Sequence, residues 1–512
     1  MQRIIEVELS GHHEKEPVAD MLRLFFEDVR ATESADGGTR LTATDPGADD
    51  TATAPIRLTV GVSPQVEREA VRAVMREQAP EPDTEYAVSV SSVNGSRERR
   101  TSLGKLRETI KLFLYEYFSE MLDVQFPWGS LTGIRPTQIA EREQLVDPET
   151  AKDRLTGYWK VRGDKADLAL WTTRHERRLL NRVPRNAPMM YMGIPFCPGR
   201  CAYCSFISRD ANRQGDRLAE YMKALEKEII LTAERMLEKN LKISALYLGG
   251  GTPTSPSDDQ FAHWLAVIDE HIDLLPDAEI TIEAGRPDTI NRAKLAAIKQ
   301  HFPEARICIN PQTMNDATLE RIGRRHTVKQ TVDAFKLSRE SGFASINMDL
   351  ILGLPGETVP EFEHSLEAII ALKPESITLH TLSLKRAARL NETAARKYRA
   401  LRYPDPEWDA AMTWAQQRLQ ELNYFPYYLY RQKNQRAGLE NVGYTLAGHE
   451  CVYNAGMMSD EVSVIGLGAG ASSKVVFGKR VERSHNSKDL LDYSARIEEM
   501  IDKKIRLFEG KY

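Results

Sequence analysis

Three of the five cysteines in this chain stand close together, at Cys197, Cys201 and Cys204. Pro198 and Gly199 lie between the first two and favour a loop, although the same spacing would also place three thiols on one face of a helix. A disulfide framework is excluded by the small, odd number of cysteines, which is typical of a reducing compartment. Zinc sites usually take a fourth ligand, and their cysteines usually come as two separated pairs. The spacing therefore favours a [4Fe–4S] cluster with three thiolate ligands and one open iron, with the helix face and catalytic zinc as alternatives.

Short β-type runs alternate with helical stretches from Met189 to about Leu384. The strand-like runs are MMYMGI, SALYLGG, EITIEAG, RICIN, SINMDLIL and SITLHTL. The helical stretches between them include RLAEYMKALEKEIILTAERML, DDQFAHWLAVIDEHI, TVKQTVDAFKLSRES and VPEFEHSLEAIIAL. This alternation predicts right-handed βαβ crossovers and a parallel sheet. Six such units predict an α/β fold with a partial (βα)6 barrel or, alternatively, an open doubly wound sheet.

Unusual polar residues and glycines lie at or near the ends of these runs. In chain order they are the cysteine loop, Gly249, Gly250 and Gly251, Glu283 and Arg286, Gln312, Asp349, and His380. In parallel α/β folds, ligands bind at the carboxyl ends of the strands. One such feature would mean little, but six in succession predict one shared cavity.

The regions before and after this alternation have different patterns. In the N-terminal part the sequence predicts a strand at RIIEVELSG, a helix at VADMLRLFFEDVR, a loop or hairpin insert at residues 31–55, a strand at IRLTVGV and a helix at KLRETIKLFLYEYFSEML. In the C-terminal part, YYLYRQKN and VSVIGLGAGASS are typical of strands with glycine-rich turns, and SKDLLDYSARIEEMIDKK is typical of a charged helix. We therefore predict an N-terminal α/β accessory domain (1–185), a barrel core (186–385) and a C-terminal domain (386–512) that could cover the open side of the barrel.

The composition excludes several classes of function. The 512 residues carry a net charge of −5 without a long basic block, so we expect no nucleic-acid partner. No apolar run approaches the roughly 20 residues of a membrane span, and the first residues lack a secretory signal. We expect a cytoplasmic protein.

The segment CPGRCAYC resembles the signature of the radical S-adenosylmethionine (SAM) enzymes, including the aromatic Tyr203 before the last cysteine. In that family the amino and carboxylate groups of SAM chelate the open iron. The cluster passes one electron to the sulfonium, which yields methionine and a deoxyadenosyl radical. The resemblance thus implies a [4Fe–4S] cluster held by the three cysteines, with SAM as the second cofactor. The family's partial barrel agrees with the six βα units.

A narrower resemblance is to the oxygen-independent coproporphyrinogen III dehydrogenases, the HemN family. It rests on YMGIPFCPGRCAYC, YLGGGTPT, EAGRPDTI, INPQTMND, RIGRRHT and INMDLILGLPGET, and more weakly on GLGAGASS. The long N-terminal region and YLYRQKNQRAGLENVGY are most similar to the HemZ branch. Gly193 and Phe206 replace a histidine and a cysteine of HemN, as in that branch. No role of the histidine carries over to this chain.

The resemblance also implies roles for individual residues. Contacts to SAM are implied for Tyr203, Gly249, Gly250, Gly251, Thr252, Glu283, Gln312, Arg324 and Asp349. Tyr191 is expected to reach SAM or substrate and is our one candidate catalytic residue. The structural alternatives are a tight turn at the glycines, an ion pair between Glu283 and Arg324, and a packed strand tyrosine at Tyr191.

The family's reaction is the oxidative decarboxylation of coproporphyrinogen III to protoporphyrinogen IX in anaerobic haem biosynthesis, with flavodoxin or ferredoxin as conceivable reductants. The substrate's propionates require cations, for which Arg386, Arg389, Arg431 and Lys433 are candidates, and Asn441 and Tyr444 align loosely with a polar-aromatic stretch of the relatives. Cys308 and Cys451 are predicted to be structural or incidental.

Two alternative functions stay open, a radical SAM enzyme acting on another porphyrin and a haem-binding chaperone. The related chaperones carry a His-Asn-x-x-Tyr-Trp motif. This chain has ENVGYT, with Glu440 in place of the histidine.

Overall fold

The computed structural model describes residues 4–33, 39–44, 56–66, 70–71, 74, 84–93, 95–204, 209–383, 403–432, 435–478 and 480–510. They divide into two compact units. The first contains described residues of Met1–Leu168, Thr393–Asp405 and Lys433–Leu439, and the second those of Ala169–Glu392, Pro406–Gln432 and Glu440–Tyr512. The division falls inside a helix, α6 (Gly163–Leu180). Our domain boundaries at residues 185 and 385 remain a proposal.

The first unit is built on one six-stranded sheet with the order β2-β3-β1-β4-β5-β6. Its strands are β1 (Ile4–Ser10), β2 (Glu27–Glu33), β3 (Thr39–Thr44), β4 (Ile56–Ser63), β5 (Tyr86–Ser92) and β6 (Gly95–Thr101). Its helices are α1 (Lys15–Phe25), α3 (Leu106–Leu122), α4 (Pro136–Val146) and α5 (Ala151–Gly157), with the 3-10 turns η1 (Leu103–Lys105) and η4 (Arg436–Gly438). Alternate residues of β1 are buried, as expected for a strand with one face on a core.

The predicted strands and helices of this unit are present, with one boundary wrong, while residues 34–38 and 45–55 of the predicted insert lie outside the described residues. The helix predicted at VADMLRLFFEDVR ends at Phe25, where Phe26 becomes extended and the chain enters β2. Ala31 on β2 pairs with Leu41 on β3, so the first part of the predicted insert is the end of a hairpin. Strand pairing overrides the helical spacing there, because the apolar residues serve the hairpin instead of another helical turn.

The second unit contains six parallel strands, in the sheet order β14-β13-β12-β11-β10-β7. They are β7 (Met189–Ile194), β10 (Ile243–Gly250), β11 (Leu274–Glu283), β12 (Arg306–Gln312), β13 (Ile346–Leu352) and β14 (Ser376–Thr381). The order follows the chain from β7 to β14, as in a (βα)6 partial barrel. Apart from β11, most of which is only partly buried, these strands are almost continuously buried, which is typical of parallel strands covered on both faces.

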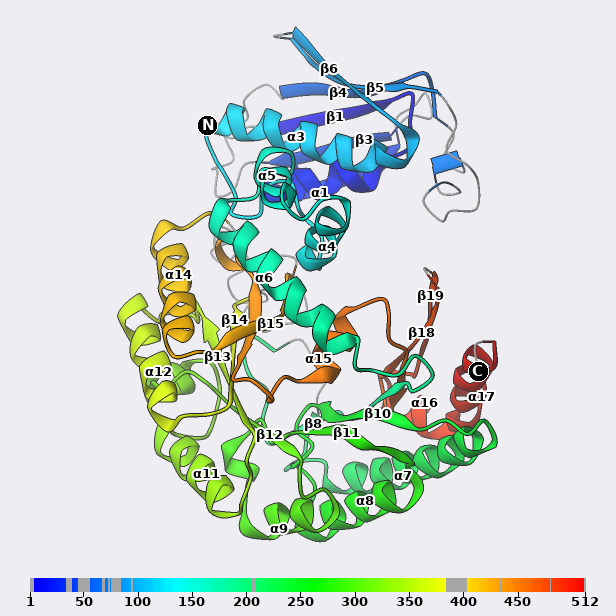
Figure 1. Ribbon diagram of the computed structural model, residues 1–512, viewed down its shortest axis with the longest axis vertical. Helices are drawn as coiled ribbons and strands as arrows, with labels where there is room; N and C mark the ends of the chain where they lie inside the picture. Colours follow the sequence, from blue (N-terminus) through cyan, green and yellow to red (C-terminus); the bar gives the residue numbers. More distant parts are fainter. Residues whose placement is uncertain are drawn as a thin grey trace. The chain divides into compact units, whose positions relative to one another are not determined.

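Helices connect these strands and lie on their outer side (Figure 1). They are α7 (Gly215–Glu238), α8 (Asp258–His271), α9 (Arg292–His301), α10 (Asp316–Arg321), α11 (Val328–Glu340) and α12 (Val359–Leu372), with the 3-10 turn η2 (Pro287–Thr289) after β11. Ser257 and Thr327 form capping boxes at the starts of α8 and α11. These caps satisfy the first amides of each helix and fix where it begins.

The C-terminal segment continues the barrel sheet at both of its edges. At one edge β16 (Asn441–Thr445) pairs antiparallel with β14 and is followed in the sheet by β15 (Phe425–Tyr430). At the other edge β17 (Val464–Leu467) pairs parallel with β7, with β18 (Ser472–Phe477) and β19 (Arg480–His485) beyond it. The remaining helices are α14 (Pro406–Glu421), α15 (Val452–Met458), α16 (Leu490–Ala495) and α17 (Ile497–Glu509). The single charged helix predicted at SKDLLDYSARIEEMIDKK is thus two helices.

A buried polar cluster fastens the end of the chain to α7. The carboxylate of Glu228 accepts hydrogen bonds from the ammonium of Lys504 (2.6 Å), the hydroxyl of Tyr493 (2.6 Å), the amide of Asn486 (2.8 Å) and the backbone N–H of Gly468 (2.7 Å). Glu228 and Lys504 are both fully buried. We call these residues the Glu228 anchor.

Within the described ranges, no helix combines the length and the apolarity needed to cross a bilayer.

Candidate functional site

One cavity of about 530 Å³ is lined by twelve of the predicted site residues, whereas Gly249, within β10, does not line it. The twelve are Tyr191, Cys197, Cys201, Tyr203, Cys204, Gly250, Gly251, Thr252, Glu283, Gln312, Arg324 and Asp349. The cavity lies at the carboxyl ends of the parallel strands, as the strand-end pattern predicts. Residues far apart in the chain, such as Cys197 and Ile351, both line it because the parallel topology brings every strand end to one side.

The cysteine loop is closed at its base by a short parallel pairing. Phe196 of β8 (Phe196–Cys197) pairs with Arg209 of β9 (Arg209–Asp210). Within the loop, the amide of Cys204 donates to the carbonyl of Cys201 (3.2 Å), and Ala202 donates to Ile322 in the loop after α10 (2.8 Å). These bonds hold the three thiols at the cavity while residues 205–208, with Phe206, lie outside the described residues.

The glycine-rich segment after β10 packs directly on the strand that leads to the cysteines. A Cβ on Gly250 would lie 2.9 Å from the backbone of Ile194, and one on Gly251 would lie 2.5 Å from the carbonyl oxygen of Phe196. Gly250 also has a φ of +105°. The hydroxyl of Thr252 donates to the sulfur of Cys197 (3.4 Å). The glycines are therefore required by the backbone-to-backbone approach as well as by any ligand.

Six tyrosines form an aromatic wall that the sequence pattern did not single out beyond Tyr191. They are Tyr191, Tyr247, Tyr427, Tyr428, Tyr430 and Tyr453. Tyr191 stacks on Tyr247 (ring centroids 6.3 Å apart), and Tyr247 stacks on Tyr453 (4.5 Å). A signal for Tyr247 exists in the sequence, because it precedes Gly249 by two residues as Tyr191 precedes Gly193 and the two strands pair in that register.

Glu283 is held in the cavity by neutral groups. Tyr247 donates to one of its carboxylate oxygens, and the amide of Asn310 donates to the other (2.8 Å). Burial, and then the charge of Asp349, raise the pKa of Glu283 to about 7. The ion pair with Arg324 that we considered is not formed, since Arg324 donates to the carbonyls of Gly285 (3.0 Å) and Asn310 (2.6 Å) and to Tyr203. Glu283 therefore has acceptor capacity for a ligand.

Hydrogen-bond donors around Asp349 favour its ionised, negatively charged form. Burial raises the pKa of this carboxyl, but the hydrogen bonds from His380, Asn347 and Thr378 outweigh burial and lower it overall. His380 Nε2 lies 3.5 Å from an Asp349 oxygen. Burial lowers the pKa of His380, and the hydrogen bond and charge of Asp349 reverse this into a net increase. The pair is thus biased toward an imidazolium beside a carboxylate.

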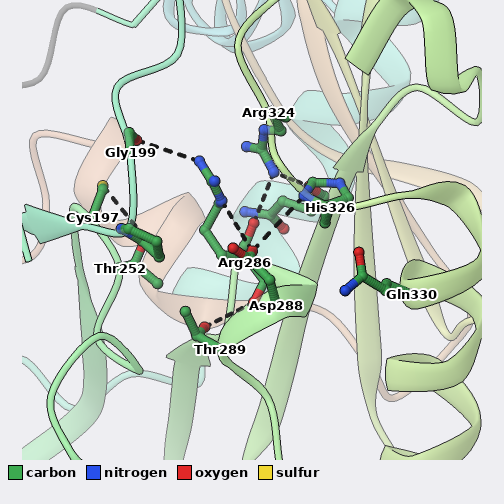
Figure 2. A network of polar contacts seen from close by, with 12 residues as sticks. Cys197, Gly199, Thr252, Arg286, Asp288, Thr289, Arg324, His326 and Gln330 are labelled. Carbon is green, nitrogen blue, oxygen red and sulfur yellow. Dashed lines mark hydrogen bonds and ion pairs between the residues drawn. The ribbon is translucent and has the colours of Figure 1, made fainter. Parts of the chain in front are cut away.

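Two arginines lie beside the cysteine loop (Figure 2). Arg286 donates to the sulfur of Cys201 (3.6 Å), and Arg324 donates to Tyr203, two residues after that cysteine (3.3 Å). Asp288 accepts from Arg286 (3.3 Å). Burial, and then the charges of Arg324 and Arg286, lower the pKa of His326 to about 3, so its imidazole is neutral at pH 7.

The residues of the cavity fit an iron–sulfur cluster and an amino-acid ligand beside it. The sulfurs of Cys197 and Cys201 already accept hydrogen bonds, as cluster-bound thiolates do. Several buried polar atoms of the cavity have no hydrogen-bond partner among the described residues, namely Gln312 Oε1, Asn310 Oδ1, Arg286 Nη2 and Arg324 Nε. Buried groups of this kind normally have partners, which a bound ligand would supply. In the part of the chain that the structure describes, no three His, Cys, Asp or Glu side chains are arranged to hold a single metal ion.

Some of the other candidate residues line the cavity and others do not. Cys308, Cys451 and Asn441 line the cavity. Burial raises the pKa of both thiols, Cys451 to about 12, so neither is a ready nucleophile. Arg431 is buried but is not among the residues that line the cavity, and Tyr444 is buried in β16. Arg386, Arg389 and Lys433 lie outside the described residues.

Comparison with known proteins gives three findings. The model of the radical SAM superfamily matches residues 191–369. The oxygen-independent coproporphyrinogen-III oxidase-like protein HemZ of Bacillus subtilis is 38% identical over 420 residues, which cover 79% of this chain and 81% of that protein. The heme chaperone HemW of the same organism is 36% identical over 193 residues, 38% of this chain and 49% of that protein.

A solved structure is also similar, although distantly. The coproporphyrinogen III oxidase HemN of Escherichia coli, described as a radical SAM enzyme, aligns with a TM-score of 0.49 and 23% identity. The alignment covers 63% of this chain and 72% of that one.

Proposed function

Because the chain belongs to the HemZ branch of the HemN family of radical SAM proteins, whose cofactors are a [4Fe–4S] cluster and SAM, we propose that it oxidatively decarboxylates coproporphyrinogen III to protoporphyrinogen IX. In this reaction each of two propionate side chains loses carbon dioxide, one hydrogen atom and one electron and becomes a vinyl group. One observation carries the proposal: the three cysteines, the glycine loop and the four polar candidate SAM contacts share one cavity with an aromatic wall.

The cluster is proposed to bind to Cys197, Cys201 and Cys204. When bound, the cluster and SAM together supply a deoxyadenosyl radical that removes a hydrogen atom from carbon. The chain's own residues must then orient the substrate, and exclude water from the cavity, so that only one C–H bond lies within reach.

SAM carries an ammonium group, a carboxylate and two ribose hydroxyls, and the cavity offers partners for each. Glu283 and the backbone around Gly250 and Gly251 can accept from the ammonium or the hydroxyls. The unpartnered nitrogen of Arg324 can donate to the carboxylate. Glu283 with a pKa of about 7 is half protonated near neutral pH, so a ligand cation beside it would lower its pKa and fix it as a carboxylate.

The aromatic wall and the His380–Asp349 pair support a porphyrinogen as substrate. A tetrapyrrole presents flat pyrrole rings, which tyrosine rings bind by stacking. The cations that line the cavity among described residues are Arg286, Arg306, Arg324 and His380. His380 is the one of these whose charge depends on a buried carboxylate, Asp349, so we assign it as a candidate contact for a propionate.

The test is anaerobic turnover of the iron-reconstituted protein with SAM, a one-electron reductant, an electron acceptor and coproporphyrinogen III, followed by mass spectrometry. We expect loss of two carboxyl groups together with methionine and deoxyadenosine. SAM cleavage with unchanged porphyrinogen would overturn the substrate assignment and favour another porphyrin as substrate. Cys201→Ala should lose the visible absorption of the cluster, and a retained cluster would overturn the ligand assignment.

A haem chaperone is the second candidate, favoured by the similarity to HemW. Position 440, where the related chaperones have a histidine, holds a Glu440 that is fully buried and accepts from Gln416 (2.8 Å). A buried carboxylate in an amide's hydrogen bond is poorly placed to bind haem iron. Stoichiometric haem binding, without SAM cleavage by a protein that holds its cluster, would favour the chaperone.

A further inference from the structure

The guanidinium of Arg286 is buried against the cysteine loop. Arg286 is 3% exposed, and its Nη1 donates to the sulfur of Cys201 (3.6 Å). The same nitrogen donates to the carbonyl of Gly199 (3.4 Å) (Figure 2). Its Nη2 is buried without a hydrogen-bond partner among the described residues. A buried cation with unused donor capacity is costly unless a negative group stands beside it.

The position of Arg286 is fixed from its own turn. Nε donates to the carboxylate of Asp288 two residues later (3.3 Å). The carbonyl of Arg286 accepts from the hydroxyl (2.8 Å) and the backbone N–H (2.9 Å) of Thr289. The 3-10 turn η2 thus presents the guanidinium to the loop in one orientation, since both its backbone and its Nε are bonded.

The charges around this sulfur do not cancel. Arg286 and Arg324 both lie beside Cys201, whereas Asp288 is the one carboxylate that bonds to either guanidinium among the described residues. His326 in the same network is neutral at pH 7. A [4Fe–4S] cluster with three thiolates is an anion whose negative charge increases when it takes up an electron, and nearby charge and hydrogen bonds to sulfur set its reduction potential.

We propose that Arg286 is a positioning residue of the cluster, which donates a charged hydrogen bond to the thiolate of Cys201 and thereby raises the reduction potential. The electron comes from an external one-electron reductant, and the added charge on the cluster is offset by the guanidinium without a proton transfer. This inference rests on the proposed ligand role of the three cysteines and is independent of the proposed substrate.

The test is a redox titration of the reconstituted full-length protein with dithionite, followed by electron paramagnetic resonance, without SAM or porphyrinogen. Arg286→Gln should lower the midpoint potential so that, at the wild-type midpoint, the ratio of reduced to oxidised cluster falls about tenfold, which is 59 mV for one electron. Arg286→Lys keeps the positive charge but not the planar guanidinium, so its midpoint potential should fall less. Arg292→Gln removes the same charge from the exposed face of α9 and should leave the potential unchanged.

An Arg286→Gln protein with full iron content and the wild-type midpoint would overturn the inference. An unchanged midpoint with weaker SAM binding in equilibrium dialysis would also overturn it, because Arg286 would then be a SAM contact. If Arg286→Gln takes up no iron, Asp288→Asn decides, since it removes the negative charge beside the guanidinium. Its midpoint should rise, and an unchanged or lower midpoint would overturn the inference. None of these readouts requires turnover, so failure of the proposed reaction leaves them interpretable.

Discussion

Two glycine-rich segments flank the first barrel strand, and one borders the cavity whereas the other belongs to the Glu228 anchor. Residues 249–252 span the end of β10 on one side of β7, and residues 466–470 span the end of β17 on the other. Both pass very close to the same piece of backbone. A Cβ on Gly250 would meet Ile194 at 2.9 Å, and a Cβ on Gly468 would meet the carbonyl oxygen of Gly193 at 2.4 Å.

The difference lies in what the neighbouring groups bind. Thr252 donates to the sulfur of Cys197 and lines the cavity. Gly468 and Ala469 donate their backbone N–H groups to Glu228 and Tyr221, and residues 466–470, all described, are not among those lining the cavity. Glycines thus report a close backbone approach in both places. What distinguishes the ligand site from the anchor is the hydrogen-bond partner of the nearby groups, which is a cysteine sulfur for Thr252 and the side chains of Glu228 and Tyr221 for the N–H groups of Gly468 and Ala469.

The largest effect should come from breaking the Glu228 anchor. Glu228→Gln leaves the fully buried ammonium of Lys504 without its carboxylate, so we expect a loss of about 3–5 kcal/mol in the free energy of unfolding. Urea denaturation measures it. Glu226→Gln on the same helix, in a largely exposed pair with His263, should cost less than about 1 kcal/mol. A Glu228→Gln protein of wild-type stability would contradict the anchor.

The two glycine segments can be compared directly by adding one methyl group to each. Gly468→Ala combines a φ of +98° with the contact to Gly193, and we expect a loss of about 3 kcal/mol in stability with the iron content per folded chain unchanged. Gly251→Ala must displace Phe196, next to Cys197, so iron content after reconstitution should fall. Equal iron loss in both variants would remove the distinction.

The two buried glutamates also differ in their partners, and the partners of Glu283 should make stability depend on pH. Glu228 has a lysine partner, whereas Glu283 accepts from Tyr247 and Asn310 and its pKa is raised from 4.5 to about 7. Folded Glu283 therefore binds more protons than unfolded Glu283 between those pH values, and its burial lowers stability as pH rises through that window. Glu283→Gln should stabilise the cluster-free protein by about 3 kcal/mol at pH 7.5 and hardly at pH 4.5. A pH-independent difference in urea denaturation would refute this.

The smallest effect should come from the hydroxyl of Thr252. Thr252→Val removes one hydrogen bond to the sulfur of Cys197 and keeps the shape of the side chain. We therefore expect the loop that holds the cluster to lose about 1 kcal/mol of stability. Measured as iron release to a chelator, this corresponds to roughly fivefold faster loss. Thr413→Val, whose hydroxyl bonds to the carbonyl of Asp409 within α14 away from the cavity, is the matched control for a lost threonine hydroxyl. A release rate equal to that of the wild type would show that the bond does not support the cluster loop.

The barrel could be predicted from the sequence because the patterns of its strands and helices are local. The runs MMYMGI and VPEFEHSLEAIIAL coincide with β7 and α12, and the polar residue at each strand end reaches the shared cavity through the parallel topology alone. The roles of the individual SAM contacts remain predictions, since they concern a ligand.

Features that depend on distant pairing could not be predicted. Nothing near Val464 states that it pairs with Met189, so the extension of both sheet edges was missed. The His380–Asp349 pair was missed for the same reason, because the two residues lie on adjacent strands in different βα units. Helical spacing continued through Phe26, although the chain there joins a hairpin.

The placement of β17 beside β7 has a consequence for the order of events during synthesis. Val464 leaves the ribosome about 275 residues after its partner Met189, which is on the order of 15–55 s at 5–20 residues per second. During that time one edge of the first barrel strand, which leads into the cysteine loop, has no neighbour. An unpaired edge strand invites pairing with other chains. Nascent chains that stop before β17 should therefore aggregate, and stable retention of iron should begin only once β17, in the last tenth of the protein, has been made.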